Sequence, residues 1–310
     1  MRLRMLSCAA MPRHVLVTGG AGFIGSHLVD AYLERGWHVS VVDDLSTGDR
    51  SNLNPRATFY EADIAKVDLA EIQPDVINHH AAQMDVRRSV SDPVFDAVVN
   101  VLGSVSLLQK AVEIGVKRFI FASTGGAIYG EPVFAPQTED HPTNPLSPYG
   151  CAKLAVEHYM NYFRVVHGLP AVALRYANVY GPRQNSKGEA GVVAIFIERK
   201  LRGEKATING DGEQTRDFVY VEDVVEANMA VTDSADSGPF NVGTGVETSI
   251  NQLASLLGIN TVHGPAKAGE QRRSVLDGSK LGAARTALRE GLEKTEVWFR
   301  KYDAPTQNRF

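Results

Sequence analysis

The sequence predicts an α/β fold in which one parallel sheet lies between two layers of helices. Three observations indicate it. Over the first 180 residues or so, short apolar runs alternate with segments of helix length. These runs are continuously rich in Val, Ile and Ala, which is typical of strands buried on both faces. The first run leads directly into a glycine-rich turn and a helix. We therefore expect a doubly wound sheet of the Rossmann type, followed by a second, smaller α/β lobe.

Six strands are expected at the spacing of successive βαβ units. The intervening segments are long enough for the crossover helices that parallel strands require. In chain order the strands are HVLVT (14–18), WHVSVVD (37–43), ATFYEAD (57–63), DVINHHAA (75–82), KRFIFAS (117–123) and PAVALRYAN (170–178).

After about residue 180 the chain changes character. A polar, glycine-rich stretch precedes the helix-like VVAIFIERKLRG and a series of short strands and turns. The apolar segment 238–244 is an exception, because it has the composition of a buried strand and is expected to return to the main sheet. We therefore expect a Rossmann domain at 12–178, rejoined by 217–248, and a second lobe formed by 179–216 and 249–310.

Composition and charge exclude several classes of protein. The 310 residues are 44% hydrophobic and 22% charged, which is typical of globular proteins and excludes disorder, collagen and coiled coil. With 32 basic against 36 acidic residues the formal charge is −4, so no basic field favours a nucleic acid. We find no apolar stretch of about 7 residues at the start and no apolar run of about 18 anywhere, so neither a signal peptide nor a membrane span is expected.

The sequence indicates neither a disulfide framework nor a metal site. Its two cysteines, Cys8 and Cys151, are expected to be free thiols in the reducing cytoplasm. His79 and His80 are adjacent but have no Cys or carboxylate partner at ligand spacing, so we interpret them as the end of a buried strand.

Two expected helices, 93–115 and 149–168, are apolar on nearly all sides. An ordinary surface helix has one apolar face. Each of these helices is therefore expected to bury two surfaces, one on the sheet and one on a second copy of the chain. A homodimer is the favoured interpretation, and a thick monomer core is the alternative.

The segment TGGAGFIGSHL follows the first expected strand and predicts a dinucleotide site. Gly19, Gly22 and Gly25 are three residues apart, where missing side chains let the backbone turn sharply and approach a diphosphate at a helix N-terminus. Asp43 ends the second expected strand, where a carboxylate accepts hydrogen bonds from the adenosine ribose and repels a 2′-phosphate. The pattern favours NAD over NADP, and Asp44 is expected to share the role of Asp43.

The segment SPYGCAK places Tyr149 and Lys153 four residues apart, on one face of a helix. Ionising a tyrosine near pH 7 requires lowering its reference pKa of about 10 by about 3 units, or roughly 4 kcal/mol. One cation at about 4 Å supplies that much only at an effective dielectric constant of about 20. Lys153, with a positively charged nicotinamide, is therefore sufficient only inside a closed site. By spacing alone, a packed surface helix is the competing interpretation.

Several motifs follow one another along the chain: TGGAGFIGSHL, YGCAK (149–153), RYANVYGPRQ (175–184), GDGEQTRDFVYVED (210–223) and FNVGTG (240–245). Their order resembles the extended short-chain dehydrogenase/reductase family, and most closely its UDP-glucose 4-epimerases and their bacterial sugar-nucleotide relatives. The resemblance spans nearly the whole chain after Met11. It implies an NAD-dependent enzyme that acts on a UDP-sugar.

The resemblance also implies roles for individual residues. Tyr149 would be the catalytic base, and Lys153 its partner and a ligand of the nicotinamide ribose. A Ser or Thr upstream of a Tyr-Gly pair would hydrogen-bond the reacting sugar oxygen. The segment ASTGGAIYG is one residue longer than the common epimerase pattern, so Thr124 is expected in this role and Ser123 is the fallback. The further cofactor positions are Phe23, Ile24, Asp43, Asp63, Ile64, Ala81, Ala82, Asn100, Lys153 and Tyr176.

For the sugar nucleotide, the resemblance implies that Asn178 and Arg216 bind substrate, with Arg216 on the diphosphate. Farther along, KAGEQRRSV replaces the more usual Arg-Pro-Gly-Asp. Lys267 therefore stands where an arginine usually binds phosphate, and Glu270 where an aspartate usually accepts the uridine ribose. The alternative phosphate ligands are Arg272 and Arg273.

The expected reaction is interconversion of UDP-glucose and UDP-galactose through a 4-keto sugar. Related dehydratases carry an Asp-Glu pair directly after the active-site Thr, and related decarboxylases a Glu, whereas this chain has Gly125 and Gly126 there. Ser274 stands where an aromatic residue excludes N-acetyl groups in this family, so N-acetylated UDP-hexosamines are expected to react too. A UDP-glucuronate 4-epimerase with Arg183 or a residue of SKGEAG on the carboxylate, another nucleotide-sugar epimerase, and a non-catalytic NAD-sensing regulator remain alternatives.

Overall fold

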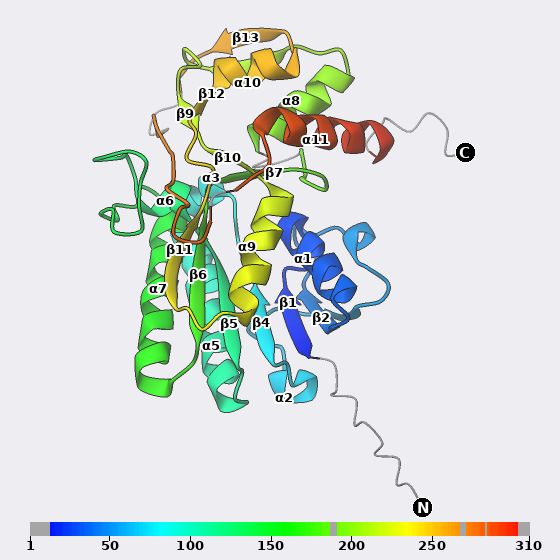
Figure 1. Ribbon diagram of the computed structural model, residues 1–310, viewed down its shortest axis with the longest axis vertical. Coiled ribbons are helices and arrows are strands. Elements are labelled where there is room, and N and C mark those ends of the chain that lie inside the picture. Colours follow the sequence, from blue (N-terminus) through cyan, green and yellow to red (C-terminus); the bar gives the residue numbers. More distant parts are fainter. Residues whose placement is uncertain (1–12, 187–190, 267–270, 283, 303–310) are drawn as a thin grey trace, which may run out of the picture.

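The centre of the molecule is a seven-stranded parallel sheet (Figure 1). The structure is a computed structural model that describes residues 13–186, 191–266, 271–282 and 284–302. Six strands coincide with the predicted ones to within a few residues, and segment 238–244 supplies the seventh, which pairs with β6. From edge to edge the order is β3 (Thr58–Glu61), β2 (His38–Asp43), β1 (His14–Thr18), β4 (Val76–His79), β5 (Arg118–Thr124), β6 (Ala171–Tyr176) and β11 (Gly238–Val242).

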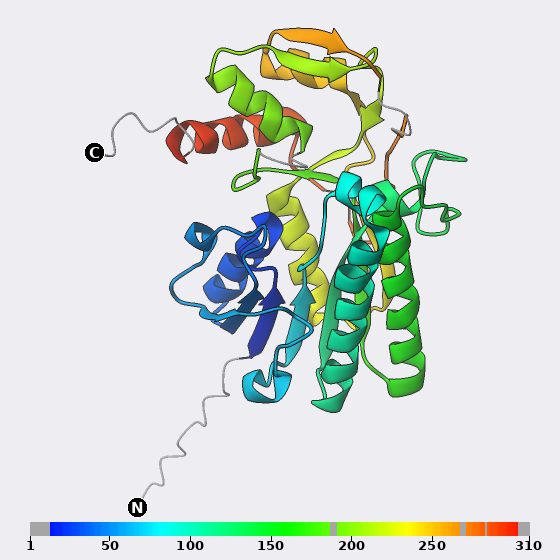
Figure 2. The same cartoon turned by 180° about the vertical axis from the view of Figure 1, so that it is seen from behind.

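Helices cover both faces of this sheet, as the continuous apolar strands predict. The helices α1 (Phe23–Glu34) and α9 (Val221–Asp233) lie on one face, where they share a core with β1 and β6. The helices α5 (Gly103–Glu113) and α7 (Pro148–His167) lie side by side on the other face (Figure 2). The direction of the chain reverses between β1 and β4, and such a switch point opens a crevice at the carboxyl ends of the strands.

The predicted helix 93–115 is interrupted. It consists of α4 (Pro93–Ala97), a π-helical segment (Val98–Leu102) and α5. π-Helical turns insert one extra residue and occur often at functional sites. Here the insertion brings the amide of Asn100 onto the loop after β4, where it donates a hydrogen bond to the carbonyl of Gln83 at 2.9 Å. This tertiary contact is invisible in the helical period of the sequence.

The same stretch corrects a second expectation. By length and composition, Pro93–Glu113 is able to cross a bilayer, with a mean hydropathy of 1.2. The sequence contains no unbroken apolar run over this stretch, because Gly, Ser and Asn interrupt the apolar residues. Core helices of soluble proteins satisfy the same criterion, and Leu107 and Leu108 of α5 are buried against the sheet.

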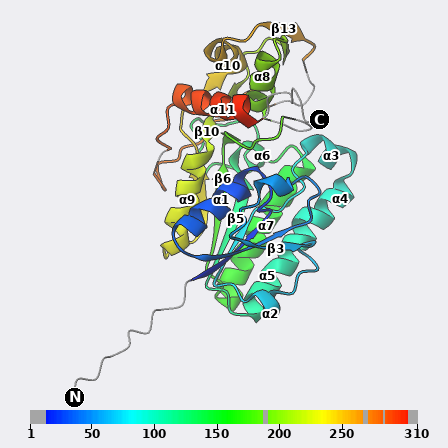
Figure 3. The ribbon, with the colours of Figure 1, turned by 90° about the vertical axis from the view of Figure 1, so that its right-hand side faces the viewer.

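The second lobe lies above the carboxyl ends of the strands (Figure 3). The pair β7 (Asn178–Tyr180) and β10 (Phe218–Tyr220) connects it to the main sheet. The apolar core of the lobe lies between its three helices and its short strands. These elements are α8 (Val192–Leu201), β8 (Ala206–Asn209), β9 (Thr215–Arg216), β12 (Thr248–Ser249), α10 (Ile250–Leu257), β13 (Thr261–Gly264) and α11 (Leu288–Tyr302).

The remaining short elements lie in the connections. They are η1 (Arg50–Asn52), α2 (Leu69–Ile72), α3 (Val86–Ser91) and α6 (Gly125–Ile128). The helix α6 begins directly after β5 and α3 packs against α7, so both lie beside the crevice at the carboxyl ends of the strands.

Candidate active site

The glycine-rich turn after β1 has the close approaches that its glycines predict. Gly19 has a φ of 70°, and a Cβ there would lie 2.6 Å from the backbone nitrogen of Ala81. A Cβ on Gly25 would lie 2.2 Å from the carbonyl oxygen of Gly19, so a side chain at Gly25 would push the turn away from α1. Gly22 is the N-cap of α1 and offers no side-chain cap. The first N–H groups of α1 are therefore suited to bind a diphosphate.

Asp43, at the end of β2, is buried and tied to this turn. Its carboxylate accepts hydrogen bonds from the N–H groups of Ala21 at 3.0 Å and of Leu45 at 2.9 Å. Burial raises its pKa, and these two hydrogen bonds oppose the rise. Asp44 is exposed, and its carboxylate accepts from the N–H of Ser46. Asp43 thus positions the glycine-rich turn. It also occupies the position predicted to bind the adenosine ribose.

The other predicted cofactor positions follow the ends of neighbouring strands. Phe23 and Ile24 begin α1, and Ala81 and Ala82 follow β4. Tyr176 ends β6, and its hydroxyl hydrogen-bonds His80 at 3.1 Å and Asn228 at 2.8 Å. Asp63 and Ile64 follow β3, where Ile64 is buried and Asp63 is exposed. The parallel sheet thus places these residues along one edge, the edge that the second lobe faces.

Tyr149 and Lys153 lie side by side in the first turns of α7. The ammonium of Lys153 is 5.7 Å from the centre of the Tyr149 ring and donates to the carbonyl of Ala122 at 2.9 Å. Burial lowers the pKa of Lys153 to about 8, against the opposing charges of Asp96 and Glu157. Burial and the charge of Asp96 raise the pKa of Tyr149. Ionising Tyr149 near neutral pH therefore requires positive charge beside its hydroxyl.

Ser123 and Thr124 occupy different environments at the end of β5. Ser123 is buried, and its hydroxyl donates to Glu157 at 2.5 Å. Glu157 in turn forms a buried ion pair with Arg175 at 2.6 Å. Thr124 is partly exposed and stands at the N-cap of α6, where its side chain makes no capping hydrogen bond. Ser123 therefore belongs to a buried polar cluster below the site, whereas Thr124 faces the crevice.

The two glycines after Thr124 differ in the space around them. A Cβ on Gly125 would lie 2.5 Å from a methyl group of Leu276, so a larger residue there requires the buried side chain of Leu276 to shift. A Cβ on Gly126 would meet only the hydroxyl of Ser274 at 3.7 Å and that of Thr124 at 3.9 Å. Thr124, Gly126 and Ser274 therefore border one small space. Ser274 is 1% exposed, and its hydroxyl has no hydrogen-bond partner within the described part of the chain.

Asp217, which the sequence analysis missed, connects several chain segments on the substrate side of the site. Its buried carboxylate accepts hydrogen bonds from Thr244, Gly245 and Leu276, and its own N–H donates to the carbonyl of Ser274. Arg216 immediately precedes it. The motif QTRDF contained this aspartate, but a buried carboxylate that accepts several backbone hydrogen bonds leaves no periodic signal in the sequence.

The predicted phosphate and uridine ligands are only partly described. Asn178 begins β7 and its N–H donates to the carbonyl of Asp217 at 2.9 Å. Lys267 and Glu270 lie outside the described residues. The alternatives Arg272 and Arg273 form bidentate ion pairs with Asp211 and Glu247, respectively. Both guanidinium groups are therefore engaged by carboxylates, which weighs against their replacing an arginine on the diphosphate.

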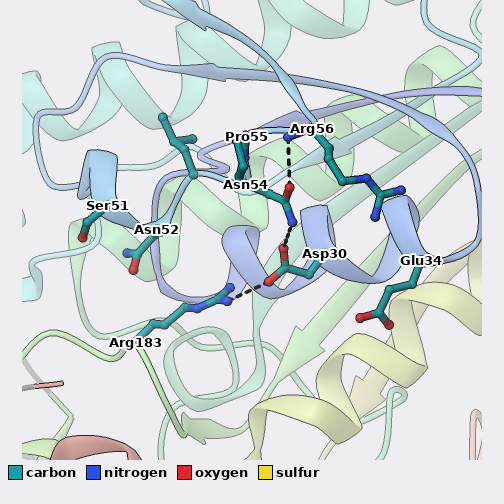
Figure 4. Close-up of a pocket in the computed structure, with 9 residues that line it drawn as sticks. Asp30, Glu34, Ser51, Asn52, Asn54, Pro55, Arg56 and Arg183 are labelled. Atoms are coloured by element: carbon teal, nitrogen blue, oxygen red, sulfur yellow. Dashed lines mark hydrogen bonds and ion pairs between the residues drawn. The ribbon is translucent and has the colours of Figure 1, made fainter. Parts of the chain in front are cut away.

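Arg183, the expected ligand of a uronate carboxylate, points elsewhere. Its guanidinium donates to Asp30 of α1 at 2.7 Å, and Asp30 also accepts from Asn54 at 2.7 Å (Figure 4). Together they border a cavity of about 370 Å³ whose lining includes none of the predicted catalytic residues. The expectation that Arg183 holds a sugar carboxylate is unsupported, because an aspartate far away in sequence holds its side chain.

Among the described residues, no group of three or more His, Cys, Asp or Glu side chains lies close enough to hold a metal ion. His79 hydrogen-bonds Thr18 and Ser104 instead. Cys151 is a free, exposed thiol, and Cys8 lies outside the described residues.

The comparisons with known proteins agree with this geometry. Residues 15–243 match the model of the NAD dependent epimerase/dehydratase family. The chain belongs to this family. A UDP-glucose 4-epimerase from Mycolicibacterium smegmatis is 47% identical over 306 residues, which cover 92% of this chain and 98% of that protein.

Two solved structures of related enzymes have the same fold. The UDP-glucose 4-epimerase of Thermotoga maritima with UDP-glucose is 48% identical, with a TM-score of 0.90, covering 93% of this chain and 99% of that chain. The UDP-N-acetylglucosamine 4-epimerase of Methanobrevibacter ruminantium in complex with UDP-N-acetylmuramic acid is 35% identical, with a TM-score of 0.90, covering 94% and 99%. The Rossmann-type fold and the NAD dependence expected from the sequence are confirmed.

Proposed function

We propose that this protein is a UDP-glucose 4-epimerase, which interconverts UDP-glucose and UDP-galactose. The observation that carries the proposal is the buried Lys153 beside Tyr149 at the carboxyl edge of the sheet, with Thr124 at the end of β5. The similarity to UDP-glucose 4-epimerases over most of the chain supports it.

In the proposed mechanism, Tyr149 removes the proton of the C4 hydroxyl. When bound at the glycine-rich turn and Asp43, NAD would supply the hydride acceptor and donor for C4, so that a 4-keto sugar lies between the two epimers. Lys153 holds positive charge near the Tyr149 hydroxyl, and a pKa of about 8 keeps it mostly protonated at pH 7. Thr124 donates a hydrogen bond to the C4 oxygen as its charge changes. Arg216 and Asn178 hold the nucleotide while the sugar turns.

The residues after Thr124 favour epimerisation over dehydration. Loss of water from the sugar requires an acid and a base near the neighbouring carbon atoms. Neither Gly125 nor Gly126 carries a side chain that moves a proton, and a Cβ on Gly125 would press on the buried side chain of Leu276. The dehydratase and decarboxylase alternatives are therefore disfavoured, and so is a non-catalytic regulator, because Tyr149 and Lys153 are both retained.

The space beside Gly126 supports turnover of N-acetylated substrates as well. Ser274 is small, and its hydroxyl borders the same space as Thr124. The acetamido group of these substrates is on C2, two carbons from the reacting C4, and it needs room and a polar partner. The unpaired hydroxyl of Ser274 supplies a donor at this position. We therefore propose that UDP-N-acetylglucosamine is a substrate beside UDP-glucose.

We also propose a cytoplasmic homodimer. The side chains of Val94, Val98 and Leu102 are 72%, 50% and 61% exposed, and Val165 and Val166 of α7 are 65% and 59% exposed. We call these five residues, with Tyr162, the α4–α7 face. Large exposed apolar patches usually mark interfaces. α4 and the π-helical segment pack against α7, and a second copy would cover the exposed side chains of these helices with the same residues.

The function is tested by incubating purified protein with UDP-glucose, UDP-galactose, their N-acetylated forms and UDP-glucuronate, and by separating the products chromatographically. We expect interconversion of the first two without added reductant. Tyr149→Phe should fold and bind NAD but turn over at least about 10²-fold more slowly, a typical loss for a positioned base. Unchanged turnover in this variant would exclude the mechanism, and conversion of UDP-glucuronate alone would favour the alternative epimerase.

A further inference from the structure

Asp96 is a buried acid that the mechanism above does not use. It lies in α4, which packs against the catalytic helix α7, and it is 1% exposed. Carboxylates are rarely buried to this degree unless a cation or several hydrogen bonds compensate their charge. Neither the glycine-rich motif nor the Tyr149–Lys153 motif points to it.

One oxygen of Asp96 is firmly anchored. It accepts hydrogen bonds from the side-chain amides of Gln83 and Asn100, both at 3.0 Å. Asn100 and the backbone of Gln83 also bond each other in both directions, at 2.9 Å. This ring joins the loop after β4 to α4 and the π-helical segment. The carboxylate therefore has a fixed position.

The other oxygen of Asp96 is buried and has no hydrogen-bond partner within the described residues. Its charge is therefore not neutralised by a direct ion pair there. In a poorly solvated site, such a charge acts on the nearest ionisable groups. Tyr149 and Lys153 lie on α7, the helix that α4 packs against, and the charge of Asp96 raises the pKa of each.

We propose that Asp96 is a positioning residue, whose buried charge, held in place by Gln83 and Asn100, keeps Lys153 protonated beside Tyr149. The inference rests on the proposed function only in assigning Lys153 to the reaction. Asp96 does not touch the reacting atoms in this proposal. It acts through Lys153, whose ammonium would otherwise be destabilised by burial.

The other charged or titratable groups that face Lys153 do not replace this role. Glu157 of α7 also raises the pKa of Lys153, but its carboxylate is paired with Arg175. His79 ends β4 and is buried, and His80 follows it and is partly buried. Both are neutral, because desolvation lowers both pKa values, that of His80 to about 3. Asp96 is therefore the unpaired negative charge among these groups.

The test is Asp96→Asn, which keeps the size of the side chain and an oxygen for Gln83 and Asn100 but removes the charge. The pKa of Lys153 is then lower, so the ammonium is lost at lower pH. The basic limb of the kcat profile should move to lower pH by about one unit, and the acid limb should follow because the pKa of Tyr149 also falls. Asp96→Glu keeps the charge, so the limbs of its kcat profile should lie at the wild-type pH even if kcat is reduced.

A second measurement separates this proposal from the proposed function. In NAD-stripped protein, the 13Cε resonance of Lys153 should titrate near pH 8 in the wild type and about one unit lower in Asp96→Asn. Asp85→Asn is the matched control, because Asp85 lies in the nearby loop before α3 and its carboxylate caps that helix. If Asp96→Asn fails to fold, Asp96→Ser removes the charge with a smaller side chain. If the Lys153 titration and the limbs of the kcat profile stay at the wild-type pH in Asp96→Asn, or move to higher pH, the proposal is wrong. An inactive wild type would overturn the function instead.

Discussion

At the scale of single residues, the site depends on which polar groups are already engaged. Ser123 and Thr124 are neighbours with the same chemistry, yet Ser123 donates to Glu157 whereas Thr124 borders the space beside Gly126. Arg272 and Arg273 both have the chemistry of a phosphate ligand, yet their guanidinium groups are paired with Asp211 and Glu247. The available group, rather than the residue type, determines what the site can do.

Ser274 is the residue at which substrate breadth can be tested. Ser274→Tyr would place a ring in the space bordered by Thr124 and Gly126. We expect turnover of UDP-N-acetylglucosamine to fall at least about tenfold, whereas UDP-galactose turnover stays within a few-fold, since one clash costs about 1–3 kcal/mol. Steady-state kinetics on both substrates measures this difference.

Ser274→Ala is the control for this substitution, because it removes the hydroxyl without filling the space. It should keep UDP-galactose turnover and lower UDP-N-acetylglucosamine turnover only a few-fold, because it removes the donor proposed for the acetamido group. Thermal unfolding shows whether the tyrosine disturbs the buried segment. Equal losses on the two substrates in a stable Ser274→Tyr protein would mean that Ser274 does not line the sugar pocket.

At the scale of elements, the helices on one side of the sheet have two apolar surfaces. Leu107 and Leu108 of α5 and Val156 and Met160 of α7 are buried against the strands. The α4–α7 face carries further apolar side chains in solvent. A monomer would leave this face exposed at a cost of about 25 cal/mol for each Å² of apolar surface.

Val165→Glu should therefore weaken the proposed dimer. The side chain is 65% exposed, so a charge there leaves the folded monomer intact but opposes burial at an apolar interface. Sedimentation velocity at micromolar concentration should show a dimer in the wild type and mainly monomer in the variant. Val297→Glu is the matched control, because Val297 of α11 is also 65% exposed and lies outside the face. Dimers that persist unchanged in Val165→Glu would place the interface elsewhere.

At the scale of the whole molecule, the site is assembled from distant segments. Predicted cofactor positions lie at the ends of β1, β2, β3, β4 and β6, and the predicted substrate residues Arg216 and Ser274 lie in the second lobe. Asp217 joins that lobe to the sheet by binding residues that follow β11. A cofactor that is held between these parts and regenerated in place does not need to dissociate during the catalytic cycle.

We therefore expect the protein to retain NAD through purification. Asp43→Ala should lose most of it, because the substitution removes both the ribose acceptor and the hydrogen bond to Ala21. Chromatography of the nucleotide released by acid measures the amount retained. Bound ligand also stabilises the fold, by about 2.7 kcal/mol at a concentration 100 times its Kd, so the variant should melt at lower temperature in added NAD.

Asp49→Ala is the control for Asp43→Ala, since Asp49 is in the same loop but caps only η1. It should retain NAD. Activity of the purified protein only under a continuous supply of NADP would contradict the role of Asp43.

The sequence by itself determined the sheet, the glycine-rich turn and the Tyr149–Lys153 pair. Each of these depends on local order: the period of apolar residues, the spacing of three glycines, or a separation of four residues on a helix. The family resemblance added Thr124 and the substrate positions, because several motifs in one order are more specific than any single motif.

Only the tertiary structure decided which polar side chains are paired with other residues of the chain and which can bind a ligand. Arg183 binds Asp30 across 153 residues, Asn78 bonds Asn228 across 150, and Asp96 accepts from Gln83 and from Asn100 of the π-helical segment. No local pattern encodes such pairs, because the partner is chosen by how helices and strands pack after the chain has folded. The buried charge of Asp96 beside the catalytic helix is therefore a property of the packing, and it was invisible in the order of the residues.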